Sequence, residues 1–110
     1  MAKELTVFRE FIGDSPTTRL LEFLIEGRFF DYTLTELAEK AGVSWRTLHR
    51  IFPYVIKAKI VKKTREVGRA KLYTLNQENP GVKKLIELFD RLLEEDVSYI
   101  KEVPKIKTTI

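Results

Sequence analysis

Apolar residues recur at helical spacing in two neighbouring segments, residues 33–42 and 44–57. The first segment carries its stripe at positions i, i+3, i+4 and i+7, which predicts an amphipathic helix. Its members are Leu34, Leu37, Ala38 and Ala41. The second segment has a similar stripe, which we expect to face the core. Its members are Leu48, Ile51, Phe52, Val55 and Ile56.

Capping residues mark the ends of both predicted helices. Thr33 and Glu36 form a capping box, in which each side chain can bind the backbone amide of the other residue. Gly42 ends the first helix, because glycine readily adopts the left-handed conformation. Val43 is expected to be buried in the turn, and Ser44 caps the second helix. A short turn followed by a polar, cationic helix is typical of a helix-turn-helix, although a generic pair of amphipathic helices would have the same stripes.

The residues before this motif predict a short arm and a central core helix. Residues 1–14 form an N-terminal arm or short helix, with a strand at residues 6–8 as the alternative. Ser15 caps a new helix and Pro16 suits its first position. Gly27 ends this mostly apolar helix. Residues 29–33 are expected to form a short strand, with Phe29, Phe30 and Tyr32 covering the edge of the core.

Residues after the second helix predict a basic β-hairpin. Pro53 is expected to bend that helix, which we expect to continue to about Lys57. Two β-prone runs then span residues 60–75 and flank Gly68, which supplies the positive φ of a tight loop. Lysines on an ordinary edge hairpin would protect against aggregation. Directly after a basic helix, the hairpin is better interpreted as a wing that contacts DNA phosphates or the minor groove.

A last helix, residues 79–100, begins at Asn79 and Pro80 and keeps an apolar stripe over four turns. We expect this stripe to form a homodimer interface, with folding back onto the first helix of the same chain as the alternative. The interface residues would be Val82, Leu85, Ile86, Phe89, Leu92 and Leu93. Residues 101–110 are expected to be a flexible basic tail, and residues 15–78 the DNA-binding domain.

Charge is concentrated in the middle of the chain. The net charge is +4, but residues 44–71 contain nine basic residues and one acidic residue, which gives this segment +8. A positive face of this kind is typical of a polyanion binder. The chain has no cysteine, one histidine and no motif for a metal or nucleotide, so we expect neither catalysis nor a cofactor. Apolar runs of about three residues predict no membrane span, and we expect a cytoplasmic protein.

Three segments together resemble the winged helix-turn-helix transcriptional regulators, in particular the small archaeal ones related to the ArsR and MarR groups. They are LTELAEKAGVSWRTLHRI, IVKKTREVGRAKLYTLN and the C-terminal helix, and the resemblance covers residues 15 to about 93. It implies a dimer that binds a pseudo-palindromic operator, with the second helix of the motif in the major groove. By position, Trp45, Arg46 and Arg50 match base-reading residues. Ser44, Thr47 and His49 match phosphate-contacting residues, and Arg69 matches the tip of the wing.

Lys59 departs from this pattern. The family usually has glycine between the recognition helix and the wing. A lysine there must either adopt an unfavourable φ or change the turn and with it the angle of the wing.

The sequence as a whole predicts a mainly α winged helix-turn-helix that binds double-stranded DNA in a sequence-specific way as a homodimer. Alternatives are a sequence-neutral architectural DNA binder and a winged-helix module that binds another protein. Neither the operator nor a small-molecule effector can be identified. The predicted DNA-binding residues are Ser44, Trp45, Arg46, Thr47, His49, Arg50, Lys62, Lys63, Arg65, Arg69 and Lys71.

Overall fold

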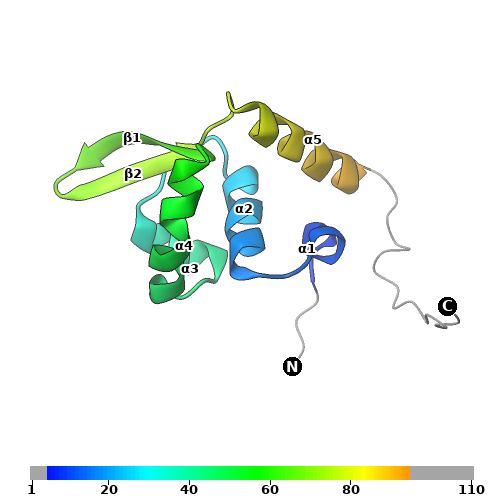
Figure 1. The fold of residues 1–110 in the computed structure, drawn as a ribbon, viewed down its shortest axis with the longest axis horizontal. Coiled ribbons are helices and arrows are strands. Elements are labelled where there is room, and N and C mark those ends of the chain that lie inside the picture. Colours follow the sequence, from blue (N-terminus) through cyan, green and yellow to red (C-terminus); the bar gives the residue numbers. More distant parts are fainter. Residues whose placement is uncertain (1–4, 95–110) are drawn as a thin grey trace, which may run out of the picture.

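The computed structural model describes residues 5–94, and its architecture is mainly helical with one β-hairpin (Figure 1). The predicted tail at residues 101–110, the end of the predicted last helix and the first four residues lie outside the described part. The described elements, in order, are α1 (Val7–Ile12), α2 (Pro16–Glu26), α3 (Leu34–Ala41), α4 (Trp45–Lys57), β1 (Val61–Val67), β2 (Ala70–Leu75) and α5 (Pro80–Glu94).

Helices α3 and α4 form the predicted helix-turn-helix. The capping box is present, since the Thr33 amide donates to Glu36 Oε1 at 2.8 Å and the Glu36 amide donates to Thr33 Oγ1 at 3.1 Å. Gly42 ends α3 in the left-handed conformation with φ of 71°. Val43 is buried in the turn, and Ser44 Oγ accepts from the Thr47 amide at 3.1 Å. These features confirm the predicted limits of both helices.

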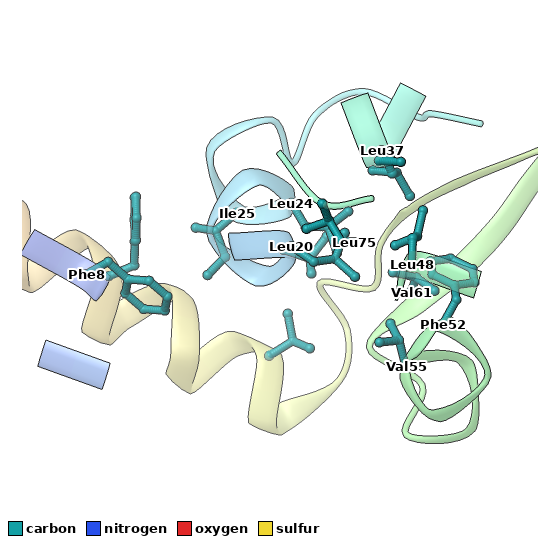
Figure 2. Close-up of a cluster of buried hydrophobic side chains, with 14 of the residues drawn as sticks. Phe8, Leu20, Leu24, Ile25, Leu37, Leu48, Phe52, Val55, Val61 and Leu75 are labelled. Carbon is teal, nitrogen blue, oxygen red and sulfur yellow. The ribbon is translucent and has the colours of Figure 1, made fainter. Parts of the chain in front are cut away.

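The core is built around α2. Leu20, Leu24 and Ile25 are buried on this helix, and α2 packs against α1, α3, α4 and β2. Figure 2 shows Leu20, Leu24 and Leu75 gathered beside α2, with Leu48 and Phe52 next to them on the side of α4. The capped start at Ser15 and Pro16 is confirmed, because Ser15 Oγ accepts from the Thr18 amide at 3.1 Å.

The hairpin extends beyond the helices, past α3 and α4 (Figure 1). Its strands pair in antiparallel register from Val61↔Leu75 to Val67↔Ala70, and Gly68 in the turn has φ of 64°. The register shifts between Lys63 and Arg65, so a β-bulge leaves one extra residue on β1. The predicted short strand at 29–33 is a single bridge, in which Tyr32 pairs with Tyr73.

The short helix expected near the N-terminus is present as α1, which Thr6 caps, and the alternative strand at residues 6–8 does not form. Two expectations about burial are wrong. Phe29 and Phe30 do not cover the core, since 77% and 68% of their surfaces are exposed. They lie in the turn after α2, where backbone and side-chain hydrogen bonds tie residues 30–32 to the hairpin but leave both rings facing outward. Ile56 is 44% exposed. It lies about 100° around α4 from Val55, at the edge of the apolar stripe.

Helix α5 begins as predicted, with Asn79 Oδ1 accepting from the Gly81 amide at 2.8 Å. Part of the stripe predicted to form the homodimer interface is already covered within the chain. Val82, Phe89 and Leu92 are already buried in a single chain, and the rings of Phe8 and Phe89 meet edge to face at 5.4 Å between centroids. Helix α5 therefore folds back onto α1, which was the alternative interpretation. Of the other proposed interface residues, Leu85 and Ile86 are half-buried and Leu93 is 61% exposed.

No helix within residues 5–94 is long and apolar enough to cross a membrane.

Candidate nucleic-acid interface

The outer face of α4 carries two arginines. Leu48, Phe52 and Val55 are buried and fix which side of the helix faces the core. Arg46 and Arg50 stand four positions apart on the opposite side, where both are exposed. Neither arginine forms a hydrogen bond or ion pair with any residue in the described part of the chain. Their guanidinium groups are therefore available to an external partner.

Trp45 and His49 form a stacked pair on the same helix. Their ring centroids are 3.6 Å apart with an interplanar angle of 32°, and His49 Nδ1 lies 3.2 Å from the Trp45 carbonyl oxygen. A carbonyl only accepts, so Nδ1 donates and the Nε2 of a neutral ring is an acceptor. The sequence predicts both residues at the interface, but their pairing was not predicted. Their i, i+4 spacing is the signal that predicts such a contact.

A hollow of about 280 Å³ lies between the start of α3, the first half of α4 and β2. It brings together four of the predicted DNA-binding residues from two separate elements, namely Trp45, His49, Arg69 and Lys71. Hydroxyl groups and apolar side chains complete its lining, which also includes Thr33, Leu34, Thr35, Ala70 and Tyr73.

The five wing cations differ in their surroundings. Lys63 Nζ is 2.7 Å from Glu66 Oε2, and this hydrogen bond raises the pKa of Lys63. Arg65 is bound to Asp31, with Nε to Oδ2 at 2.9 Å and Nη2 to Oδ1 at 3.2 Å. Lys62 and Arg69 form no hydrogen bond or ion pair with residues 5–94. Lys71 stands opposite Glu66 in the register and contributes to lowering the pKa of that carboxyl, after the larger effect of Lys63.

Asp31 was not identified from the sequence. The hydrogen bond from Arg65, followed by that from Thr64, lowers its pKa to about 2. Because Asp31 and Arg65 are 34 positions apart, no local pattern indicates the pair.

Lys59 retains the turn that a glycine would make. Its φ is 59°, a positive value that no other non-glycine residue in the described chain adopts. The Lys59 carbonyl accepts from Asn76 Nδ2 and from Asn79 Nδ2, both at 3.0 Å. These bonds hold the backbone at the junction of α4 and the wing. Of the two alternatives for this position, the unfavourable φ is confirmed.

Within the described residues there is no group of three or more histidine, aspartate and glutamate side chains that could hold a metal ion.

Comparison with models of protein families gave no match, and comparison with curated proteins gave none. Solved structures do match. An apo mutant of Lactococcus lactis ZitR is 18% identical with a TM-score of 0.58, and the match covers 76% of this chain and 64% of that one. The antimony-specific transcriptional repressor AntR is 22% identical with a TM-score of 0.55, covering 80% of this chain and 74% of that one.

MepR, a transcription regulator of the Staphylococcus aureus multidrug efflux pump MepA, is 12% identical with a TM-score of 0.58, covering 88% of this chain and 70% of that one. A further structure is a ZitR mutant in complex with DNA, with a TM-score of 0.53. The described elements and these likenesses confirm the predicted fold, a winged helix-turn-helix that is mainly α with one β-hairpin. The chain spans about two thirds of the length of the ZitR chain, slightly less at 64%.

Proposed function

We propose that this protein is a transcription regulator that binds double-stranded DNA, with α4 in the major groove and the hairpin along the backbone. The carrying observation is the set of exposed cations on α4 and on the hairpin, two of the elements that line the hollow of about 280 Å³. Arg46 and Arg50 stand on α4, and Arg69 and Lys71 stand on the hairpin. No carboxylate lines the hollow between them.

Sequence reading is assigned to Arg46 and Arg50. Both belong to the N-terminal half of α4, which is the part of a recognition helix that reaches base edges. Each guanidinium can donate two hydrogen bonds to O6 and N7 of guanine, a contact that contributes roughly 1–3 kcal/mol of discrimination. Trp45, 57% exposed beside them, offers an apolar surface to a thymine methyl group.

Contacts with the DNA phosphate backbone, which do not depend on the base sequence, are assigned to a second group of residues. Ser44 and Thr47 belong to the first turn of α4, where the free amides of the helix attract phosphate. Lys62, Arg69 and Lys71 on the wing are exposed and would neutralise phosphates, so they contribute affinity for any duplex.

The solved structures support this proposal through the shared fold. One ZitR structure is a complex with DNA, and AntR and MepR are described as transcription regulators. An architectural role would use the same cations without sequence preference, and a protein-interaction role would not need the two arginines.

Homodimerisation is part of the proposal. Helices α1 and α5 contact each other and still expose apolar side chains, namely Phe11, Ile12 and Leu93. Burying these residues against a second copy would remove an exposed apolar surface from water. Leu85 and Ile86, which are half-buried, would lie beside this contact.

The test is selection from a random duplex library at about 150 mM salt, where the Debye length is about 8 Å and non-specific attraction is damped. We expect a two-fold motif whose half-sites lie about one helical turn, or ~34–36 Å, or a multiple of that apart. Retention without an enriched motif would indicate the architectural role. No retention would refute DNA binding and favour a protein partner.

Variants then assign roles to residues. Arg46→Ala and Arg50→Ala should lower affinity for the selected site and relax the base preference. Lys62→Ala should weaken binding to all duplexes alike and reduce the salt slope by about one. Lys83→Ala is the matched control, since this exposed lysine is on α5, away from the hollow. Equal losses on every duplex for both arginine variants would contradict base reading by α4.

A further inference from the structure

We propose that Asp31 is a positioning residue that holds the wing at the angle required for DNA binding, and that Arg65 serves this contact instead of contacting DNA. The proposal rests on the DNA-binding function proposed above. It changes the assignment of Arg65, which the sequence places among the DNA-contacting cations.

Both carboxylate oxygens of Asp31 accept hydrogen bonds from residues of β1. Oδ2 accepts from Thr64 Oγ1 at 2.6 Å and from Arg65 Nε at 2.9 Å, and Oδ1 accepts from Arg65 Nη2 at 3.2 Å. Fork-shaped contacts of this kind fix orientation as well as distance. The guanidinium of Arg65 is therefore directed at its own chain.

The neighbours of Asp31 bind the other strand. The Tyr32 amide donates to the Tyr73 carbonyl and the Tyr73 amide donates back to Tyr32, each at 2.8 Å. Thr74 Oγ1 donates to the Phe30 carbonyl at 2.8 Å. Residues 30–32 therefore connect to both strands of the hairpin, with backbone bonds to β2 and side-chain bonds to β1.

The β1 contact is made at the β-bulge. Thr64 is the residue without a partner in the register, between Lys63 and Arg65. A bulge bends and twists a hairpin locally, so its position affects where the tip points. By binding Thr64 and the next residue, Asp31 holds the bend itself.

Strand β1 has little besides Asp31 to hold it, whereas β2 buries Leu72 and Leu75 and bonds to residues 30 and 32. After Val61, every residue of β1 is exposed, so burial does not hold this strand against the helices. An isolated two-stranded hairpin is only marginally stable in water. On β2, Arg69 and Lys71 line the hollow and depend on the hairpin for their position.

Electrostatics and positioning make opposite predictions for Asp31→Asn. Removing an acid near a cationic surface should strengthen DNA binding if long-range charge alone matters. If the substitution freed Arg65 to bind a phosphate, DNA binding would strengthen as well. If Asp31 positions the wing, binding should weaken although the protein has become more basic. Glu66→Gln is the matched control, because it removes one acid from the same hairpin and leaves the Asp31 contacts intact.

The first readout needs no DNA. Amide hydrogen exchange of residues 61–75 should be faster in Asp31→Asn than in the wild type or Glu66→Gln, with exchange in α2 unchanged. Unchanged exchange in the hairpin would overturn the proposal, whether or not the protein binds DNA. Failure of the wild type to bind any duplex would instead refute the proposed function.

The second readout is affinity for the selected duplex over a range of salt concentrations. We expect Asp31→Asn to bind about tenfold more weakly and the salt slope to fall by about one to two, since each lost phosphate contact removes roughly 0.9. Arg65→Ala should weaken binding in the wild-type background and add little to Asp31→Asn. Tighter binding by Asp31→Asn, or an equal effect of Arg65→Ala in both backgrounds, would show that Arg65 contacts DNA and would overturn the proposal.

Discussion

Substitution of Phe8 tests whether α5 belongs to the fold of the single chain. Helix α1 has six residues, too few to be stable by itself in water, so packing must stabilise it. Phe8 is its buried residue and meets the ring of Phe89 at 5.4 Å (Figure 2 places Phe8 beside α5). Its loss should therefore destabilise α1 and the attachment of α5 together.

Phe8→Ala should lower the free energy of unfolding by about 3–5 kcal/mol, which is the usual cost of removing a buried phenylalanine side chain. In a domain of this size each kcal/mol corresponds to roughly 4–8 °C in Tm. At protein concentrations low enough to keep the chain monomeric, Phe11→Ala is the control, because Phe11 is the same residue type on the same helix but is exposed in the single chain. It should change the free energy of unfolding by no more than about 0.5 kcal/mol.

Urea denaturation followed by circular dichroism measures both variants, and a double-mutant cycle with Phe89→Ala should give a coupling of about 0.5–1.5 kcal/mol from the ring pair. Several protein concentrations should be compared, because association would make the midpoint depend on concentration. A loss for Phe8→Ala no larger than that for Phe11→Ala would refute packing of α5 on α1. A loss that disappears at high concentration would place Phe8 in the dimer interface.

Three further predictions concern local geometry. Lys59→Gly should raise the free energy of unfolding by up to about 1 kcal/mol and raise Tm with it. Relief of the left-handed conformation, roughly 1–2 kcal/mol, exceeds the cost of the added flexibility of the unfolded chain. A lower Tm would contradict this. Ser44→Ala removes the cap of α4 and should lower the free energy of unfolding, measured by urea denaturation, by about 1 kcal/mol, whereas Ser44→Thr should lower it less. The lowered pKa of Asp31, about 2 against an ordinary 3.8, means that its contacts stabilise the fold above about pH 4 and that this stabilisation is lost as the pH falls towards 2. The stability difference between the wild type and Asp31→Asn should therefore shrink over that range, and a constant difference would show that the carboxylate does not titrate in this way.

Local signals in the sequence predicted the helix-turn-helix and the hairpin well. The capping box at Thr33, the left-handed glycines and the cap at Ser44 each act within a few residues, so their effect can be inferred without knowing the rest of the fold. The departure at Lys59 was also visible, because φ is a property of one residue.

Features that depend on distant parts of the chain were not predictable in the same way. The stripe on α5 showed that it needs a partner but not that Phe8 supplies it. Phe29 and Phe30 are aromatic residues that the sequence places over an edge of the core, yet within the described residues both rings remain largely exposed. Asp31 and Arg65 are charged residues of ordinary appearance, and only the fold brings them together.

The junction at Lys59 also links three elements mechanically. Asn79 caps α5 through Oδ1, while its Nδ2 donates to the carbonyls of Ala58 and Lys59 at the end of α4. Asn76, at the end of the hairpin, donates to the same Lys59 carbonyl. A rotation of α5 would have to break these bonds or carry the end of α4 and the base of the hairpin with it. A force applied to the far end of α5 would therefore be transmitted to the proposed DNA-binding elements through the hydrogen bonds at the Ala58 and Lys59 carbonyls.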